Sequence, residues 1–331
     1  MSGNVIILGG KGRFGRAAMA AYQQAGWRVR SLVRSVAEDP RHVIGDALDG
    51  DTVIMATKDC DLIINALNPP YPLWRRELPR LTRSVIAAAR ATGAAVMLPG
   101  NVYNYGAGMP ENLREHTLYL PTTRKGRLSV EMEAAYAQAD GVRTIVLRAG
   151  DFIERETTGN WFDSQITKNL AKGRMMYPSP LDRVHAWAYL PDMARAMAAL
   201  AGKRDDFSRF EDFGFPGYSL TGQALIDAIG RVAGRELGIK SLPWPLLRLL
   251  GLVMPQMREV AEMAYLWHTP HAIDGTKMAA ALPNFQPTPL TAALNDALTG
   301  ENLQAAPCGP VSRNAAMCSA FRKQSRSGGS L

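Results

Sequence analysis

Three glycines follow a short apolar run near the start of the chain, at spacings that suit phosphate binding. Residues 5–8 are apolar and of strand length, Gly9, Gly12 and Gly15 come next, and an alanine-rich helical pattern follows them. Glycine tolerates positive φ angles and lets backbone N–H groups come close to a pyrophosphate. The N-terminus of the following helix turns its positive dipole end toward the same anion. In this strand–turn–helix context the glycines predict a dinucleotide site; the alternative is a glycine-rich turn without a ligand.

The residues after the second apolar run indicate which dinucleotide is bound. The run 28–33 ends at Arg34, where a fold selective for NAD usually places an acid on the ribose 2′-hydroxyl, and no acid occurs before Glu38. A guanidinium pairs with a phosphate through two parallel hydrogen bonds. Arg13 and Phe14, inside the glycine loop, are further expected cofactor contacts, and Arg13 could approach the same 2′-phosphate. We therefore expect NADP(H) rather than NAD(H); the alternative is that both arginines are solvated surface residues.

The elements that must position this loop alternate between strand and helix along the first half of the chain. Such alternation is typical of a parallel sheet covered by helices on both faces. We expect an α/β fold: a Rossmann-type doubly wound parallel sheet in residues 1–150, and a smaller, mostly helical substrate lobe in residues 151–300 with some segments returning to the Rossmann core. The expected strands lie at 5–8, 28–33, 42–45, 61–66, 95–98, 144–147 and 184–189. The longer expected helices lie at 73–92, 126–139, 191–200, 221–233, 245–252 and 257–267.

Composition limits the class of protein. The 331 residues are 47% hydrophobic and 21% charged, which is ordinary for a globular protein. No apolar run approaches the length of a membrane span, and the first residues lack the basic region and cleavage site of a signal peptide. The three cysteines, Cys60, Cys308 and Cys318, lie far apart without metal-ligand spacing. We expect a cytoplasmic protein with no membrane contact and no metal.

The net charge of +8 does not predict nucleic-acid binding. Residues 301–331 carry a net +3, so the rest of the chain carries about +5, and its basic residues are dispersed rather than gathered on a helix. A mildly basic surface that attracts a phosphorylated cofactor explains as much. The segment 301–331 is rich in Ser, Gly and Ala without periodicity, and we expect it to be a disordered tail.

Motifs spread along the chain together resemble a known superfamily. They are Gly9-x-x-Gly12-x-x-Gly15, Asp46, Asn65-Ala66-Leu67, Val102-Tyr103, Leu147-Arg148-Ala149-Gly150 and Tyr189-Leu190-Pro191-Asp192-Met193-Ala194. In this order the chain resembles the extended short-chain dehydrogenase/reductase superfamily, often called the NAD-dependent epimerase/dehydratase family, over roughly residues 4–299. The resemblance implies the Rossmann fold, contact of Asp46 with the adenine, and a nicotinamide ribose lined by Asn65, Ala66 and Leu67.

The chain departs from this family at the residues that transfer the proton. The family uses Tyr-x-x-x-Lys on the helix before the sixth strand, where the lysine lowers the pKa of the tyrosine. None of the ten tyrosines here has a lysine four residues later. Counting back from Glu131, which resembles a glutamate of the family, places Thr123 and Arg127 at the two positions. Threonine is a poor acid–base group and arginine does not release its proton at physiological pH.

Other residues could take over the proton transfer. Asn101, Tyr103 and Tyr105 follow a central strand at the edge where open α/β sheets bind ligands, and Lys125 lies two residues beyond Thr123. A catalytic tyrosine at 103 or 105 is one interpretation; the other is that both rings only line the pocket.

Arg127 has two interpretations as well. It either hydrogen-bonds the nicotinamide ribose or pairs with Glu131 one helical turn away on the surface. The catalytic candidates are therefore Tyr103, Tyr105, Thr123 and Arg127.

The remaining conspicuous residues favour structural roles. We expect His185 to be a packed core or pocket-wall residue, and His268 with His271 lack the further ligands of a metal site. The aromatic and methionine residues of 244–267 recur at helical spacing and predict lobe core, and Arg248 favours packing of the adjoining apolar run over membrane contact.

Two functions stay open. The first is an NADP(H)-dependent oxidoreductase or epimerase, with a non-standard proton donor, that acts on a small, apolar or aromatic carbonyl or hydroxyl substrate; few lobe arginines beyond Arg174 and Arg183 suit a diphosphate. The second is a catalytically silent NADP(H) sensor or partner subunit. The expected partners are a small molecule and, as an assembly, a second copy in a homodimer.

Overall fold

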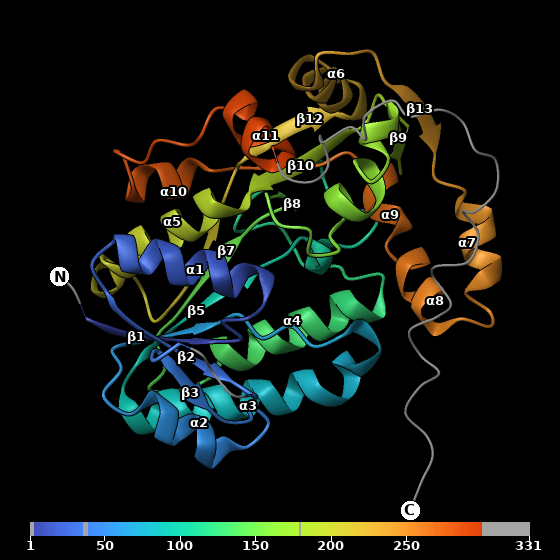
Figure 1. Ribbon diagram of the computed structural model, residues 1–331. Helices are drawn as coiled ribbons and strands as arrows, with labels where there is room; N and C mark the ends of the chain where they lie inside the picture. Colours follow the sequence, from blue (N-terminus) through green and yellow to red (C-terminus); the bar gives the residue numbers. More distant parts are fainter. Residues whose placement is uncertain (1–2, 36–38, 179, 300–331) are drawn as a thin grey trace, which may run out of the picture.

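Seven parallel strands form the central sheet of the computed structural model, which describes residues 3–35, 39–178 and 180–299. The strand order is β11-β7-β5-β4-β1-β2-β3 (Figure 1). Strands β1 to β3 extend the sheet on one side and β4 to β11 extend it on the other, so the order of the strands reverses between β1 and β4. The expected Rossmann-type doubly wound sheet is confirmed. The strands are β1 Asn4–Leu8, β2 Arg28–Val33, β3 His42–Ile44, β4 Leu62–Asn65, β5 Ala95–Gly100, β7 Thr144–Arg148 and β11 Phe210–Gly214. Of these, β11 lies beyond residue 150 and returns to the edge of the sheet beside β7.

Two helical layers cover the sheet, as Figure 1 shows. One layer holds α1 Arg13–Gln24 and α5 Leu190–Ala201, and the other holds α2 Gly50–Thr57, α3 Trp74–Thr92 and α4 Arg124–Ala137. Because side chains alternate along a strand, Val5 and Ile7 pack in the core under the first layer, and Ile6 and Leu8 pack under the second. Burial on both faces explains why this strand is apolar throughout.

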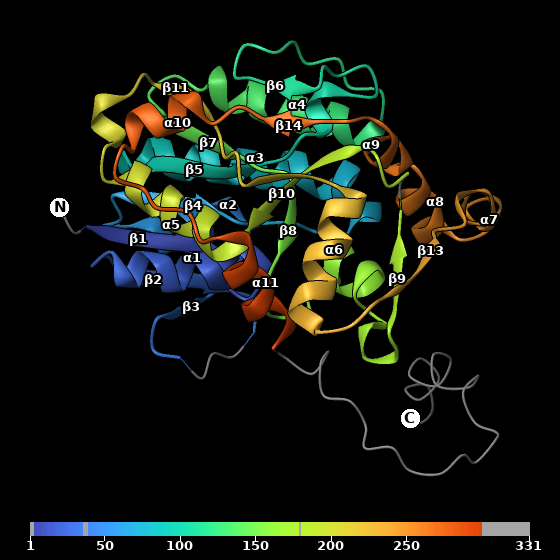
Figure 2. The same ribbon diagram turned by 90° about the horizontal axis from the view of Figure 1, so that it is seen from above.

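The C-terminal lobe combines helices with short strands. A small sheet of β12 Tyr218–Thr221, β10 Val184–Tyr189 and β8 Asp151–Ile153 forms its floor. Two pairs of short strands complete it, β13 Gly238–Ser241 with β9 Arg174–Tyr177, and β14 Ala272–Ile273 with β6 Asn112–Leu113. Its helices are α6 Gly222–Ala233, α7 Trp244–Leu250, α8 Pro255–Ala261, α9 Ala264–His268, α10 Thr276–Ala281 and α11 Leu290–Leu298. Seen from above, α6 and α11 lie over this sheet, beside the Rossmann part (Figure 2).

Short single-turn helices occupy several loops. They are η1 Tyr71–Leu73, η2 Tyr103–Tyr105, η3 Phe162–Ile166, η4 Leu170–Lys172 and η5 Arg204–Asp206. Within the described ranges, every helix is too short or too polar to cross a bilayer. The expected tail 301–331 lies outside the described residues.

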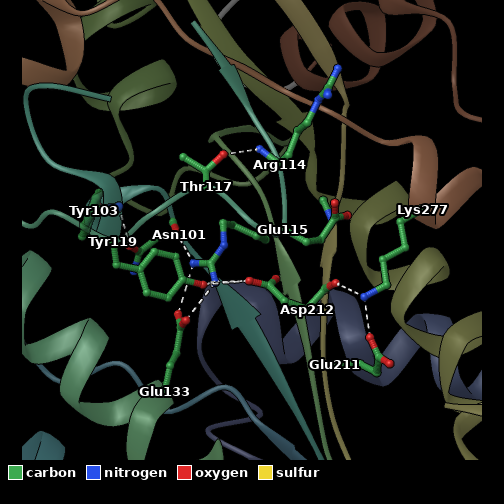
Figure 3. A network of polar contacts seen from close by, with 12 residues as sticks. Asn101, Tyr103, Arg114, Glu115, Thr117, Tyr119, Glu133, Glu211, Asp212 and Lys277 are labelled. Carbon is green, nitrogen blue, oxygen red and sulfur yellow. Dashed lines mark hydrogen bonds and ion pairs between the residues drawn. The ribbon is translucent and has the colours of Figure 1, made fainter. Parts of the chain in front are cut away.

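A buried arginine joins the elements around the last strands of the sheet. Arg148, at the end of β7, is 2% exposed, and its guanidinium lies 2.8 Å from a Glu133 carboxylate oxygen on α4 and 2.6 Å from Asp212 on β11. It also donates to the Asn101 carbonyl at 2.6 Å and to the Tyr119 hydroxyl at 2.7 Å (Figure 3). Two carboxylates and two neutral acceptors thus surround one buried cation, which fixes α4 and β11 relative to β7.

The lobe core contains a buried histidine. His271 is 1% exposed, and its Nδ1 donates to the Thr269 carbonyl at 2.9 Å. Its ring lies 4.6 Å from that of His185, which stacks on Trp267 at 4.2 Å. Burial, with a smaller contribution from the neighbouring His185, lowers the pKa of His271 from 6.5 to about 3. The folded chain therefore holds this imidazole neutral.

Replacing Arg148 by methionine should lower the free energy of unfolding by about 3–5 kcal/mol, because Glu133 and Asp212 would stay buried without their cation. Urea unfolding followed by circular dichroism measures the loss. Arg114, which is 53% exposed and pairs with Asp274 at 3.1 Å, is the control, and Arg114→Met should change stability by less than about 1 kcal/mol. Equal, small losses in both variants would contradict the structural role of Arg148.

Acid should destabilise the fold through His271. Its folded pKa is depressed, so its contribution is complete above the unfolded value of 6.5 and is lost as the pH falls toward 3. Between about pH 7 and pH 5 this histidine should cost about 2 kcal/mol of unfolding free energy. His271→Gln should remove that part of the decrease, whereas His116→Gln, at an exposed position, should keep it. An unchanged pH dependence in His271→Gln would refute the assignment.

Candidate active site

The glycine loop has the geometry of an anion cradle. Gly9 has a φ of +87°, and a Cβ on Gly15 would lie 2.2 Å from the Gly9 carbonyl oxygen, so both positions require glycine. Gly12 caps α1 and donates to the Gly9 carbonyl at 2.9 Å. Among the described residues, no side chain caps α1 and no acid lies in its first turn. The N-terminal N–H groups and the dipole of α1 are therefore left to a ligand, and the loop fits a pyrophosphate.

The two residues inside the loop point in different directions. Phe14 is 7% exposed and packs in the core beneath α1. Arg13 reaches the C-terminal lobe, where its Nε lies 2.9 Å from Glu154 and 2.7 Å from the Thr158 hydroxyl. Arg13 therefore engages the lobe rather than the end of β2, where we expected the 2′-phosphate. Only the backbone of Phe14 can face a cofactor.

Positive charge gathers at the end of β2. Arg34 is exposed there, and Lys11 of the glycine loop donates to the neighbouring Ser35 hydroxyl at 3.0 Å. Glu38 lies outside the described residues. A cavity of about 580 Å³ adjoins Lys11 and is also lined by Arg16 and by Arg41, which pairs with Asp39. Two cationic side chains, Lys11 and Arg34, thus lie with the Ser35 hydroxyl at the end of β2.

The other expected cofactor contacts follow β3 and β4. Asp46 is exposed, and its carboxylate accepts from the Leu48 N–H at 3.0 Å. The Asn65 amide donates to the Tyr136 hydroxyl at 3.0 Å and accepts from the Leu67 N–H at 3.3 Å. A Cβ on Gly9 would lie 2.9 Å from the Ala66 carbonyl oxygen, so this segment runs directly beside the glycine loop. Both sit at the reversal point of the sheet, where such folds bind ligands.

Helix α4 turns a different pair of residues inward from the one expected. Thr123 caps the helix by accepting from the Gly126 N–H at 3.1 Å. Arg127 is exposed and lines a shallow surface pocket together with Glu131. The side chains buried at intervals of four are Lys125, Ser129 and Glu133. No ion pair joins Arg127 to Glu131 among the described residues.

The α4 side chains that face inward thus lie two positions after the pair that we expected. The glutamate that lies inside is Glu133, paired with Arg148, whereas Glu131 faces solvent. Counting back from Glu133 by the same rule gives Ser129 and Lys125. These two side chains, one helical turn apart on the inner face, stand where we had placed Arg127 and Thr123.

Lys125 is a fully buried cation at the centre of the site. Its side chain is 1% exposed, and Nζ lies 2.5 Å from Glu259 and 2.6 Å from Glu262. It lies 4.8 Å from the centre of the Tyr71 ring. Ser129, one turn on, accepts a long contact of 3.4 Å from the Asn101 amide. A lysine and a serine thus occupy the inner face, and lobe carboxylates balance the lysine charge.

The two tyrosines that we considered as proton donors have different surroundings. The Tyr103 hydroxyl lies 3.1 Å from that of Tyr71, which follows β4. The Tyr103 N–H donates to the Asn101 side chain at 2.8 Å, and both residues are labelled in Figure 3. Tyr105 is 2% exposed, and its ring packs edge-on against Tyr119 beside the buried Arg148. Tyr105 thus belongs to the arginine network, whereas Tyr103 faces a second phenol.

Asp151 and His185 of the C-terminal lobe form a hydrogen-bonded pair. Asp151 on β8 accepts a hydrogen bond from His185 Nε2 at 2.8 Å, and His185 is 3% exposed. Burial is the main cause that raises the pKa of Tyr71 and of Tyr103, and the negative charge of Asp151 adds to both shifts.

Sequence reasoning missed Tyr71, Asp151, Glu259 of α8 and Glu262, which directly follows α8. Tyr71 follows a central strand, and the criterion that selected Tyr103 would have selected it too. Asp151 directly follows the Leu147–Gly150 motif. Nothing in the sequence near Glu259 and Glu262 indicated a role at the site, because they are far from Lys125 along the chain.

The histidines of the lobe do not gather metal ligands. Nδ1 of His268 bonds to the Ala264 carbonyl at 2.7 Å, and His271 bonds to Thr269. In the part of the chain that the structure describes, no group of three His, Cys, Asp or Glu side chains is placed to hold a metal ion.

Comparisons with solved structures agree with this fold. L-threonine dehydrogenase from Phytophthora infestans is 19% identical, with a TM-score of 0.71 over 89% of this chain and 97% of its own. A human epimerase family protein solved with NADPH is 18% identical, with a TM-score of 0.69 over 89% and 99%. MoeE5 in complex with UDP-glucose and NAD is 16% identical, with a TM-score of 0.71 over 89% and 97%.

The comparison with protein-family models shows to which family the chain belongs. A search of the curated proteins finds no match. The family model described as "NAD dependent epimerase/dehydratase family" matches residues 5–213, which is more than half of the chain and includes residues of all seven strands of the central sheet. With its glycine loop, its reversal point and its strand order in place, the chain belongs to the NAD-dependent epimerase/dehydratase family.

Proposed function

We propose that this protein is an NADP(H)-dependent oxidoreductase or epimerase that acts on a small, apolar or aromatic carbonyl or hydroxyl compound. The observation that carries the proposal is the pair of phenols, Tyr71 and Tyr103, 3.1 Å apart at the ligand-binding edge of the sheet and beside the buried Lys125. When bound, a nicotinamide supplies or accepts the hydride. The glycine loop and α1 would hold its pyrophosphate, and Arg34 with Lys11 would hold the 2′-phosphate.

Tyr103 is the proposed proton donor. Burial raises its pKa well above the ordinary value, so the phenol stays protonated at neutral pH. A protonated phenol can give its proton to a carbonyl oxygen as that oxygen gains negative charge. Tyr71 can then return a proton to Tyr103 through their hydrogen bond, and Tyr71, which is half-buried, regains its own proton from water after the product leaves. This arrangement favours the direction in which a carbonyl is reduced.

Lys125 and Ser129 are the proposed positioning pair. They lie one turn apart on the inner face of α4, and the Lys125 ammonium is already neutralised by Glu259 and Glu262. A cation balanced in this way contributes less to lowering a phenol pKa than a lone lysine does. We therefore assign Lys125 the task of holding Tyr71 and the lobe in place, and assign Ser129 a hydrogen bond to the ligand.

Aromatic side chains around the site support an apolar or aromatic substrate. The Trp74 ring lies 5.2 Å from Tyr71 and 6.5 Å from Tyr103. From the lobe side, Trp161 packs with the same cluster as Tyr103. Such surfaces take up flat apolar groups, with a few polar atoms setting orientation.

A silent NADP(H) sensor or partner subunit is the second candidate. The observation in its favour is that lobe carboxylates neutralise Arg13 and Lys125, the cations nearest the proposed site. NADPH absorbance in the presence of a panel of aromatic and aliphatic carbonyl compounds separates the two functions. Oxidation above background supports the enzyme, and tight NADPH binding without oxidation across the panel supports the sensor.

Removing the Tyr103 hydroxyl should stop proton transfer without loosening the cofactor. Tyr103→Phe should lower kcat roughly a hundredfold or more, with the Kd of NADPH unchanged. Tyr105→Phe and Thr123→Ala should each cost less than about tenfold, because one residue packs on Arg148 and the other caps α4. Steady-state kinetics with calorimetric NADPH binding measures both quantities. If Thr123→Ala lowered kcat strongly while Tyr103→Phe kept the wild-type kcat, the assignment would be overturned.

Arg34 should set the choice of cofactor. Arg34→Asp removes a charge-assisted contact and adds repulsion between a carboxylate and the 2′-phosphate, so NADPH affinity should fall at least about tenfold more than NADH affinity. Arg83→Asp, at an exposed position on α3, controls for the change in net charge. Equal losses for both nucleotides in Arg34→Asp would place this residue outside the site.

A further inference from the structure

The helices α7 and α8 form a short hairpin with an exposed apolar end. Each helix has seven residues, and a turn through Gly251 joins them. A Cβ on Gly251 would lie 3.0 Å from the Arg258 Cα, so a side chain here would crowd the packing of the two helices. Five large apolar side chains are exposed by 47–81%, and we call them the apolar tip: Leu246, Leu249, Leu252, Val253 and Met254.

This exposure differs from the packing that we expected for the segment. Both ends of the hairpin are anchored: Leu242 and Trp244 are buried, the Trp244 indole donates to the Pro178 carbonyl at 2.5 Å, and Glu259 at the other end pairs with Lys125. Between these ends the hairpin projects from the lobe, and α7 lies at its outer edge (Figure 2). A group of exposed apolar side chains of this size marks a contact surface rather than a core.

The charge around the apolar tip indicates what it contacts. Residues 238–258 contain no Asp or Glu, and the three charged residues of the segment, Lys240, Arg248 and Arg258, are all basic and exposed. An apolar helical edge flanked only by cations matches an interface where acyl chains lie beneath anionic headgroups. We propose that the α7–α8 hairpin docks on an anionic membrane surface, with the apolar tip inserted among the lipids.

A second copy of the chain fits this surface less well. In a symmetric dimer the same patch meets itself, so Arg248 and Arg258 of both copies would approach one another. Two seven-residue helices also offer little area compared with the roughly 800 Å² per partner of a stable interface. A lipid surface supplies both the apolar volume and the opposite charge.

Docking of the hairpin would also affect the buried ion pairs of Lys125. The end of α8 that faces away from the tip carries Glu259, and Glu262 follows it; both hold Lys125 of α4. A displacement of the hairpin on a membrane would therefore act directly on the Lys125 ion pairs. The docking proposal itself rests on the surface and does not depend on the proposed function.

Sedimentation of the full chain with vesicles tests the proposal. The vesicles are phosphatidylcholine alone, or the same lipid with about a third phosphatidylglycerol. Wild-type protein should bind the anionic vesicles and bind the neutral ones much more weakly. Leu252→Ser with Val253→Ser should weaken binding at least tenfold, and Arg248→Gln should weaken it roughly fivefold.

The control pair is Leu118→Ser with Leu120→Ser, since these leucines are 76% and 62% exposed elsewhere on the surface. This variant should bind like wild type, and thermal unfolding verifies that each variant is folded. Failure of wild type to bind anionic vesicles overturns the proposal, as does an equal loss in the control pair. A change in solution mass on Leu252→Ser with Val253→Ser, without vesicle binding by wild type, would assign the tip to a second copy instead.

Discussion

The buried ion pair between Arg148 and Glu133 sets the orientation of the site. Arg148 ends a central strand and Glu133 lies on the inner face of α4, so their 2.8 Å contact fixes how that helix is rotated against the sheet. Ser129 and Lys125 follow at one and two turns, and their inward direction is a consequence of this rotation. Such a pair contributes little net stability compared with an apolar replacement, but losing one partner is costly. The effect of this ion pair is to select one rotation of α4 against the sheet.

Ion pairs also span the two parts of the molecule at the site. Lys125 of the Rossmann part pairs with Glu259 and Glu262, and Arg13 of the glycine loop pairs with Glu154. Burial raises the pKa of Glu154, whereas its hydrogen bonds and Arg13 oppose that shift. Lys125 and Arg13 thus each have a carboxylate partner from the lobe. The lobe is held over the site by charge as well as by apolar contact, so a ligand entering there competes with these carboxylates.

The sequence was sufficient for the fold and insufficient for the helix register. Buried parallel strands are continuous apolar runs, and the glycine loop requires residues with no side chain, so both can be recognised locally. The inner face of α4 is polar, with Lys125, Ser129 and Glu133, so hydrophobic periodicity could not distinguish it from the face of Arg127 and Glu131. The apolar run of α7 looked like core for the opposite reason, because its periodicity says nothing about whether a neighbour covers it.

The central claim is that this chain binds NADP(H) at the reversal point of its sheet, with the nicotinamide facing the Tyr71–Tyr103 pair and the inner face of α4. A crystal structure of the protein with NADPH tests this most directly. The account predicts a pyrophosphate on the loop from Gly9 to Gly15, a 2′-phosphate held by Arg34, and a nicotinamide beside Tyr103. A nicotinamide beside Arg127 on the outer face of α4, or a 2′-phosphate held by Arg13, would contradict it.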